Sequence, residues 1–436
     1  MPPWVEYAIF WHLYPLGFVG AEIHPARPAP LAHRLNRLQN WLDYAVELGA
    51  SALLLGPIFA SATHGYDTLD HFRIDPRLGD DGDFDSLIAA ARSRGLSVVL
   101  DGVFNHVSRR HPLVEETLAQ GRAAPHASWF RFKDDGELEV FEGHGDLVAL
   151  NSDSPDVEDY VVAVMNHWLD RGAAGWRLDA AYAMSPQFWA RVLSRVRARH
   201  ADAFVFAELI HGDYADFVAA SGVDSVTQYE LWKAIWSSFN DRNFFELSWA
   251  LERHNGFLAH FVPQTFIGNH DVTRVASRLE DAAGLEQALA LLCVLGGVPS
   301  IYAGDEQGFR GVKEDRIGGD DAVRPEFPQA PQDLPADGGP LYRRHQELLG
   351  LRRRHPWLIR AQSRAVHVEN TRLVIEAAAA EQRLCLALNL EGPAELPAPG
   401  MRKILAGRGA RLTKPGAAAR VRLAEKGWAI LSPGAA

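Results

Sequence analysis

The sequence predicts an α/β protein: a (β/α)8 barrel with a small inserted domain after the third strand and a C-terminal β-sandwich. Through about the first 350 residues, short apolar runs alternate with segments of helical periodicity, which is typical of repeated strand–helix units. One gap between neighbouring runs is too long for a single helix and its loops. After residue 355 the pattern changes to short alternating segments broken by Gly and Pro, which indicates antiparallel strands.

Eight apolar runs are candidate strands, at residues 9–14, 52–55, 97–100, 175–178, 204–207, 225–228, 265–267 and 300–302. Apolar side chains between them recur at helical spacing, in residues 35–46, 84–91 and 157–168. Gly49, Gly95 and Gly172 follow these three segments. Each glycine suits a left-handed C-terminal cap before the next strand, so the pattern predicts strands that alternate with helices.

The third and fourth candidate strands lie about 70 residues apart, more than one helix and its loops need. We therefore predict a barrel formed by residues 1–106 and 151–355, with an inserted domain at 107–150. A further helix is expected around residues 341–354, before the sandwich domain at 356–436.

Composition limits the possible partners. The chain has 436 residues, 47% of them hydrophobic, so it can bury a large core. Its 44 basic and 55 acidic residues give a net charge of −11. This charge argues against nucleic acid or an anionic membrane surface as a partner and is compatible with a neutral ligand.

Cysteine usage and the N-terminus predict a cytoplasmic protein. Only Cys293 and Cys385 are present, in different predicted domains, so a disulfide framework is not expected. The first residues lack a basic segment followed by an apolar one, and no run approaches about 18 apolar residues. We expect no membrane partner, and either a monomer or a homodimer.

Four carboxylates stand at the ends of apolar runs: Asp101, Asp179, Glu208 and Asp271. In a parallel barrel the carboxyl ends of the strands meet in one crevice, where catalytic residues are found. Glycoside cleavage needs a carboxylic acid to protonate the leaving oxygen and a second carboxylate to trap the oxocarbenium-like centre. The pattern therefore points to cleavage of a glycoside.

Two of these carboxylates have informative neighbours. Arg177 lies two residues before Asp179, on the same side of the strand, and is expected to keep Asp179 ionised. Glu208 follows the apolar residues 204–207, and such surroundings would raise its pKa and keep it protonated. Taken singly, a strand-end Asp is usually a turn residue and an Arg–Asp pair is usually structural. Their occurrence together, in order, favours catalysis.

These motifs resemble those of the α-amylase superfamily, which comprises retaining glycoside hydrolases and transglycosidases. The resemblance covers nearly the whole chain in the family's order and is carried by residues 65–70, 74–76, 101–106, 150–151, 175–179, 206–208, 266–271 and 299–306. It implies the (β/α)8 barrel, with the inserted domain as one wall of the substrate cleft.

The resemblance also implies roles for the site residues. Asp179 matches the nucleophile, Glu208 the general acid and base, and Asp271 the carboxylate that holds two sugar hydroxyls. Residues expected to bind or support the substrate site are Tyr66, a stacking platform, Asp101, which orients Arg177, and the hydroxyl-binding His106 and His270. Tyr229 and Trp232, after the sixth strand, are candidates for the floor of the leaving-group side.

No metal or cofactor is expected. Zinc-binding spacings are absent from the sequence. Asn105 matches a calcium-binding position of many α-amylases, but residues 146–151 and 180–183 depart from the motifs that usually accompany it, so calcium is not supported. The acidic turn at residues 80–83 lacks the final Glu of an EF-hand loop and suits a helix N-cap.

Three functions are compatible with these residues. The first is a retaining α-glycoside hydrolase that acts on short malto-oligosaccharides or related α-glucosides. Ala180, directly after the matched nucleophile, resembles the residue at that position in enzymes that act on α-1,4 links. The second is a transglycosidase that uses the same residues, and the third is a non-catalytic carbohydrate-binding partner protein on the same fold. A retaining mechanism requires the carboxyl groups of Asp179 and Glu208 to lie about 5 to 5.5 Å apart.

Overall fold

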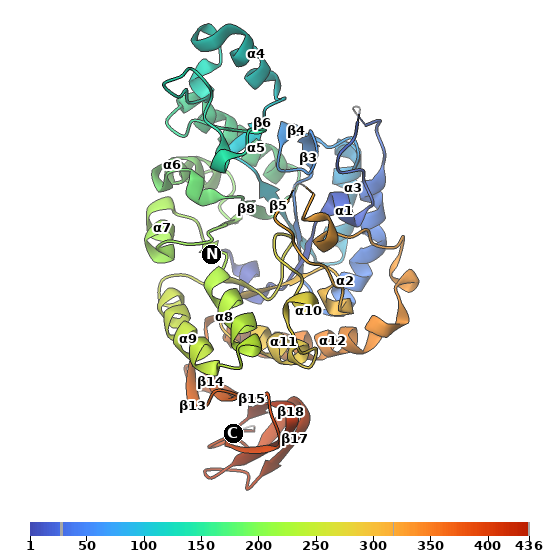
Figure 1. The fold of residues 1–436 in the computed structure, drawn as a ribbon, viewed down its shortest axis with the longest axis vertical. Coiled ribbons are helices and arrows are strands. Elements are labelled where there is room, and N and C mark those ends of the chain that lie inside the picture. The colour runs from blue at the N-terminus through green and yellow to red at the C-terminus, as the bar shows by residue number, and fades with distance from the viewer. Residues whose placement is uncertain (27–28, 317, 435–436) are drawn as a thin grey trace.

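The computed structural model describes residues 1–26, 29–316 and 318–434. Figure 1 shows a barrel in the middle of the molecule, the segment after the third barrel strand at one end and a C-terminal sheet at the other. The barrel strands are β1 (Phe10–Leu13), β2 (Ala52–Leu55), β5 (Ser97–Gly102), β8 (Gly175–Leu178), β9 (Phe204–Ala207), β10 (Ser225–Val226), β11 (Gln264–Phe266) and β12 (Val298–Tyr302).

These eight strands form one parallel sheet in the order β10-β9-β8-β5-β2-β1-β12-β11. The first strand pairs with both the second and the last, so that Phe10 lies opposite Ala52 on one side and Ser300 on the other. The two ends of the sheet meet at a parallel bridge between Thr227 and Gln264. The sheet therefore closes into the predicted (β/α)8 barrel.

All eight predicted strands are present, but the sixth is shorter than expected. β10 ends at Val226, because the next two side chains serve other elements. The Thr227 hydroxyl exchanges hydrogen bonds with the backbone of Leu209, and Gln228 caps the following helix by accepting from the Leu231 N–H. The seventh strand starts and ends one residue earlier than the sequence pattern predicts.

The helices that surround the barrel are α1 (Pro15–Phe18), α2 (Leu42–Leu48), α3 (Asp81–Ser93), α5 (Pro155–Asp170), α6 (Pro186–Arg197), α7 (Tyr214–Ser221), α8 (Tyr229–Asn240), α9 (Phe244–Leu258), α10 (Val275–Arg278), α11 (Gly284–Val294) and α12 (Gly339–Arg354). The first predicted helix is only partly α-helical, because Arg34–Trp41 is a 3-10 helix. Gly49, Gly95 and Gly172 have φ values of 107°, 73° and 101°, as their capping role predicts. Among the described residues, no helix is long and apolar enough to cross a membrane.

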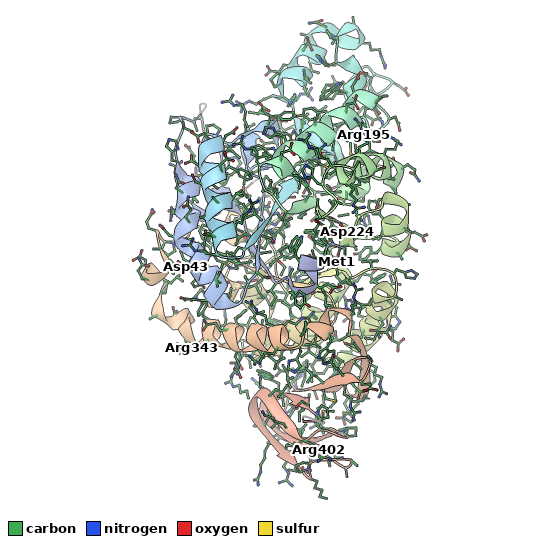
Figure 2. All side chains as sticks on the ribbon, turned by 180° about the vertical axis from the view of Figure 1, so that it is seen from behind. Met1, Asp43, Arg195, Asp224, Arg343 and Arg402 are labelled. Atoms are coloured by element: carbon green, nitrogen blue, oxygen red, sulfur yellow. The ribbon has the colours of Figure 1, made fainter. Side chains whose placement is uncertain are left out.

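Alternate side chains of the strands fill the barrel. The interior cluster consists mainly of Phe10, Ala52, Leu54, Val99, Phe204, Phe206 and Val298. The 3-10 helix Pro3–Tyr7 covers the amino end of the barrel with Val5. Figure 2 shows Met1 beside Asp224 at this end. Residues of the opposite strand faces, such as Trp11 and Trp176, pack against the helices. The interior is thus a packed core, and the crevice lies at the carboxyl ends of the strands.

The excursion between β5 and α5 contains helix α4 (Pro112–Gln120) and a small antiparallel pair. This pair joins β6 (His106–Ser108) to β7 (Leu147–Ala149), with His106 opposite Ala149. The hairpin of β3 (Phe59–Ser61) and β4 (Thr68–Ile74) lies on the same side of the barrel in Figure 1. Both excursions follow strands of the barrel and so stand beside the carboxyl-end crevice.

The C-terminal part is an antiparallel sheet of β13 (Gln362–Val368), β14 (Arg372–Ala379), β15 (Gln382–Asn389), β16 (Ala394–Pro397), β17 (Lys403–Thr413) and β18 (Arg420–Ser432). The first half of β18 pairs with β16 and its second half with β15. The two halves of this long strand therefore belong to the two layers of the small sandwich, which enclose a core that includes Cys385, Val421 and Leu431.

Candidate active site

The structure brings all eight candidate site residues together at the carboxyl end of the barrel. Asp101 is the penultimate residue of β5, and Asp179 and Glu208 follow β8 and β9 directly. Asp271 lies in the loop after β11, and Tyr66 comes from the loop between β3 and β4. Parallel strands explain this convergence, because their carboxyl ends open into one crevice.

Arg177 is the centre of the cluster and is 3% exposed. Its Nη1 lies 2.7 Å from both carboxylate oxygens of Asp101 and 3.3 Å from Oδ1 of Asp179. Its Nη2 lies 2.6 Å from Oε1 of Glu208 and 3.6 Å from Oδ2 of Asp271. One guanidinium therefore contacts all four strand-end carboxylates.

The Glu208 carboxylate lies in more polar surroundings than the apolar run before it predicts. Besides Arg177, it accepts hydrogen bonds from the Tyr229 hydroxyl at 3.0 Å and from the Ala180 N–H at 3.1 Å. Ala180 has a left-handed backbone conformation with φ 40°, which is uncommon for a residue other than glycine. The backbone reversal directly after Asp179 thus aims an N–H at Glu208.

Asp271 lies between two cationic or polar groups. Its Oδ1 accepts from Nη2 of Arg324 at 2.7 Å, and its Oδ2 lies 2.9 Å from Nε2 of His270. Burial alone would raise the pKa of Asp271, but its contacts with His270, Arg324 and Arg177 lower it well below its usual range. Asp271 is therefore ionised at neutral pH.

The balance of charge differs at Asp179. Burial raises the pKa of Asp179 well above its usual range; Arg177 opposes this effect, and the neighbouring carboxylates Glu208 and Asp101 reinforce it. Arg177 thus favours the ionised form of Asp179, as expected, but several carboxylates share this guanidinium and weaken its effect on any one of them. Burial also raises the pKa of Asp101, again against the effect of Arg177.

Tyr66 and the two predicted histidines line one side of the cluster. The Tyr66 hydroxyl donates to Oδ2 of Asp101 at 3.0 Å and contacts Nε2 of His270, and the two rings are stacked at 5.6 Å. Nε2 of His106 lies 2.8 Å from the Tyr66 carbonyl oxygen. Burial lowers the pKa of His106 to about 4, so this imidazole is neutral.

Sequence reasoning missed several residues that shape the site. Arg324 packs over the Tyr14 ring at 4.6 Å and donates to the carbonyl oxygen of His270 at 2.9 Å. The ring of Phe141 stacks on His106 at 4.7 Å. Tyr229, a sequence candidate for the leaving-group floor, donates a hydrogen bond from its hydroxyl to Glu208. Its place after the sixth strand is its sequence signal, whereas Arg324 and Phe141 lie in segments without a motif.

Asn105, the residue that matches a calcium-binding position of many α-amylases, is hydrogen-bonded to other residues of the site. The side chain of Asn105 donates to the carbonyl oxygen of Asp179 at 3.1 Å, and its Oδ1 faces Nδ1 of His106. Among the described residues, one group with metal-ligand spacing is formed by His33, Asp80 and Asp83. There the Asp80 and Asp83 side chains form a reciprocal capping box at the start of α3, as predicted for this acidic turn.

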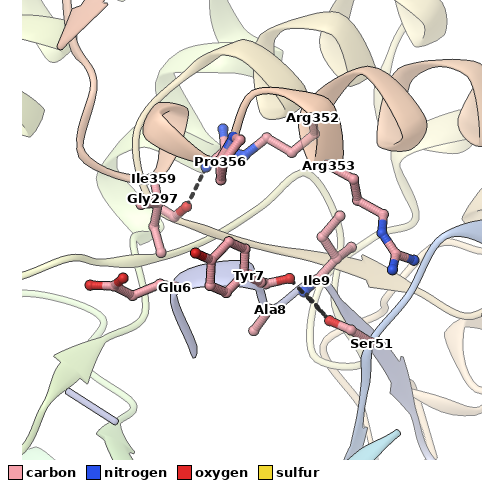
Figure 3. Close-up of a pocket in the computed structure, with 10 residues that line it drawn as sticks. All are labelled: Glu6, Tyr7, Ala8, Ile9, Ser51, Gly297, Arg352, Arg353, Pro356 and Ile359. Carbon is pink, nitrogen blue, oxygen red and sulfur yellow. Dashed lines mark hydrogen bonds between the residues drawn. The ribbon is translucent and has the colours of Figure 1, made fainter. Parts of the chain in front are cut away.

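A separate hollow of about 290 Å³ lies at the amino end of the barrel and is drawn in Figure 3. Arg352 lines it, but this guanidinium donates to the carbonyl oxygens of Cys293, Leu295 and Gly297. The donors of Arg352 thus bind the turn between α11 and β12. The hollow contains none of the strand-end carboxylates, which all lie at the opposite end.

Comparison with known proteins agrees with this geometry. The alpha-amylase catalytic domain model matches residues 34–373. A cyclomaltodextrinase of a Bacillus species is 29% identical over 343 residues, which cover 71% of this chain and 61% of that enzyme. The intracellular maltogenic amylase of Bacillus subtilis is 26% identical, over 71% of this chain and 57% of that protein. The chain thus spans about 60% of the length of these relatives.

Solved structures show the same fold over the whole chain. The ligand-free cyclic α-maltosyl-(1→6)-maltose hydrolase of Arthrobacter globiformis has a TM-score of 0.81 at 26% identity, with 99% of each chain covered. The native debranching enzyme of Nostoc punctiforme has a TM-score of 0.82 at 23% identity, again with 99% coverage of both chains, and shows the fold alone. From the catalytic-domain match and this architecture, the chain belongs to the alpha-amylase family.

Proposed function

We propose that this protein is a retaining α-glycoside hydrolase that cleaves α-glucosidic bonds of short malto-oligosaccharides. One observation carries the proposal: Asp179 and Glu208 contact the same guanidinium through different nitrogens, and Asp271 lies within reach of it. Two carboxyl groups held this way can act on opposite sides of one glycosidic bond. The net charge of −11 favours such a neutral substrate over nucleic acid.

In the proposed reaction, Asp179 attacks the anomeric carbon while Glu208 donates a proton to the leaving oxygen. The bond from the anomeric carbon to that oxygen breaks, and an ester to Asp179 forms. Water then attacks the same carbon, Glu208 takes the proton of this water, and the ester breaks. Asp271 accepts hydrogen bonds from two sugar hydroxyls, and Tyr66 supports the sugar ring. The steps need no metal.

The names of the relatives support the substrate class. Two of them are a cyclomaltodextrinase and a maltogenic alpha-amylase, and a solved structure with the same fold is a cyclic α-maltosyl-(1→6)-maltose hydrolase. The Bacillus subtilis relative is described as intracellular, which supports our proposal that this protein acts in the cytoplasm. The sequence leaves a monomer and a homodimer equally open.

Product analysis tests the proposal. The protein is incubated with maltose, maltotriose, isomaltose and trehalose, and the anomeric form of the released sugar is followed by NMR. We expect the α-anomer from α-1,4-linked substrates, because two inversions at the anomeric carbon restore its configuration. Asp179→Asn and Glu208→Gln should each lower turnover by at least about 10³-fold and remain folded by circular dichroism.

Release of the β-anomer would contradict double displacement. Near wild-type turnover by Asp179→Asn or Glu208→Gln would show that the role of that carboxyl group is assigned wrongly. Turnover of isomaltose but not of maltose would refute the α-1,4 preference and leave the retaining mechanism intact.

A further inference from the structure

The excursion between β5 and α5 touches the loop of the proposed nucleophile at one hydrogen bond. The Tyr182 hydroxyl donates to Oε1 of Glu142 at 2.8 Å. Tyr182 stands three residues after Asp179, in the short 3-10 helix Ala181–Ala183. Glu142 is exposed and lies in the 3-10 turn Phe141–Gly143. This contact, which we call the Glu142–Tyr182 latch, crosses the rim of the site.

The backbone of Glu142 holds a conformation that residues other than glycine rarely adopt. Its φ and ψ are 47° and 31°, in the left-handed region where a Cβ is disfavoured. Hydrogen bonds on both sides maintain the turn, from the His144 N–H to the Phe141 carbonyl oxygen and from the Ala149 N–H to the Glu139 carbonyl oxygen. The turn therefore presents the Glu142 carboxylate towards the rim in a defined position.

The opposite side of the carboxylate cluster is where the proposed reaction places the sugar that becomes bonded to Asp179. Tyr14, Tyr66, His270 and Arg324 pack there around Asp271. Glu208 has to face the leaving oxygen in order to protonate it. A leaving sugar on the side of Glu208, away from Asp271, meets the loops after β8 and β9.

Those two loops carry the rings of Tyr182 and His211. The rings meet edge to face at 5.5 Å, and each residue stands three positions after a proposed catalytic carboxylate. Tyr182 is half-buried and His211 is exposed. An aromatic ring with a fixed hydroxyl suits a sugar, because the ring covers an apolar sugar face and the hydroxyl oxygen, whose hydrogen is donated to Glu142, can accept from a sugar hydroxyl. Burial and the Glu142 carboxylate raise the pKa of Tyr182, so the hydroxyl keeps its proton.

We propose that Glu142 is a positioning residue that holds Tyr182 as the binding platform for the leaving or acceptor sugar. The latch then sets how often the glycosyl intermediate passes to a sugar hydroxyl instead of water. This inference rests on the proposed function and names the specificity of the same site.

The transfer step balances without another reactant. A hydroxyl oxygen of the acceptor sugar attacks the anomeric carbon, and the bond between this carbon and the Asp179 carboxylate breaks. The hydroxyl proton passes to Glu208, which restores both carboxyl groups to their starting forms. Water follows the same route, so the two acceptors compete for one intermediate.

The test measures this competition. A p-nitrophenyl α-glucoside with a ¹³C-labelled glucosyl group serves as donor at a fixed concentration with increasing unlabelled maltose as acceptor. Labelled transfer products and labelled free glucose are quantified by chromatography and mass spectrometry, so that glucose released from maltose is not counted. Their ratio is independent of the amount of folded enzyme, so partial misfolding does not affect it. The variants are Glu142→Ala, Glu142→Gln and Tyr182→Phe; Glu137→Ala, an exposed Glu of the same excursion that lies 3.7 Å from Arg109, is the matched control.

We expect Glu142→Ala and Tyr182→Phe each to lower the transfer ratio about fivefold, which corresponds to ~1 kcal/mol, the size of one hydrogen bond. The double variant should be no worse than either single one, because both remove the same contact. Glu142→Gln should retain the wild-type ratio, since the amide oxygen still accepts from Tyr182.

Two results would overturn the inference. An active wild-type enzyme with the same ratio in Glu142→Ala and Glu137→Ala would show that the latch does not select acceptors. Additive losses in the double variant would show that Glu142 does not act through Tyr182. A wild-type protein that cleaves no α-glucoside would instead refute the proposed function, and with it this inference.

Discussion

At Arg177, one positive charge contacts four carboxylates. Such an arrangement stabilises each carboxylate only in part, because the carboxylates also repel one another. Asp271 and Asp179 show two different outcomes of this balance. Asp271 has His270 and Arg324 in addition, and its pKa falls, whereas the more deeply buried Asp179 has a raised pKa. The protonation state of the site is therefore a property of the cluster and not of one pair.

This charge balance predicts the acid side of the pH–activity profile. The nucleophile has to be ionised, and burial raises the pKa of Asp179, so activity should appear only above that raised pKa and be lost as pH falls through it. We expect the acid limb of kcat/KM to lie clearly above about pH 4, the range of an ordinary aspartate. Steady-state kinetics from pH 4 to 9 measure it.

Asp101→Asn provides the comparison, since the charge of Asp101 contributes to the raised pKa of Asp179. The variant should move the acid limb to lower pH, although its maximal activity should fall about tenfold because Arg177 loses a charged partner. A wild-type acid limb at about pH 4, unchanged in the variant, would contradict the charge balance described here.

Residue by residue, the sequence predicts the carboxylates better than their partners. Asp179 and Glu208 each come directly after a short strand run, which is wholly apolar before Glu208 and contains Arg177 before Asp179, so a strand end places them. Arg324 belongs to a loop with no such pattern, yet it contacts Asp271. The polar surroundings of Glu208 come from Tyr229 and from the reversed backbone at Ala180, neither of which is visible in the run before Glu208.

Among the elements, the turn after β12 holds a buried carboxylate outside the reaction. Glu306 lies in the 3-10 helix Asp305–Gln307 and is fully buried. It accepts hydrogen bonds from the Tyr44 hydroxyl at 2.8 Å and from the Gly304 N–H at 2.9 Å. Burial raises the pKa of Glu306 to about 7. The free energy of unfolding should therefore depend on pH through the protonation of Glu306.

The sign of this coupling follows from proton binding. Between about pH 4.3, the ordinary value, and about pH 7, the folded protein keeps a proton on Glu306 that the unfolded chain has lost. Stability therefore decreases as pH rises through this window and levels off above it. Glu306→Gln stays neutral, so its free energy of unfolding relative to wild type should rise by about 3 kcal/mol between pH 4.5 and 8.

Urea unfolding at several pH values measures this difference, with the exposed Glu115→Gln as control. A constant difference between Glu306→Gln and wild type across the window would refute the assignment of the proton to Glu306.

The predicted element boundaries match the structure where a single apolar run defines the strand. They differ from it where a side chain at the end of the run also bonds to another element. β2, β8 and β9 have the bounds predicted from their apolar runs. β10 ends early because Gln228 caps α8. The 3-10 helix Arg34–Trp41 keeps apolar residues on one side, but the periodicity alone does not distinguish it from the α-helix that follows.

For the whole molecule, the predicted C-terminal domain shares its core with the barrel. One cluster of buried residues includes Leu289 of α11, Leu388 of β15 and Trp428 of β18. The Trp428 indole N–H donates to Oε2 of Glu286 at 3.1 Å, and Arg344 lies 5.3 Å from its ring. The sheet therefore supports α11 and α12 from outside the barrel.

Trp428→Ala should lower the free energy of unfolding by about 3–5 kcal/mol through the loss of buried surface and the cavity it leaves. The barrel and the sheet should still unfold in one calorimetric transition, because they share a core. Trp249→Ala is the matched control, since that ring is 63% exposed. Two separate transitions, with only the weaker one shifted by Trp428→Ala, would show that the sheet is energetically independent of the barrel.

The closure of the barrel has a consequence for how the protein responds to heat. Around most of the circumference several consecutive pairs hold neighbouring strands, whereas β10 and β11 meet at the Thr227–Gln264 bridge and at the bond from the Gln228 N–H to the Gln264 carbonyl oxygen. Local opening starts where few such bonds hold the backbone. This seam lies directly before Tyr229, the partner of Glu208. Warming should therefore open the wall beside the proposed proton donor and abolish the proposed activity while most amides of the barrel remain protected from exchange.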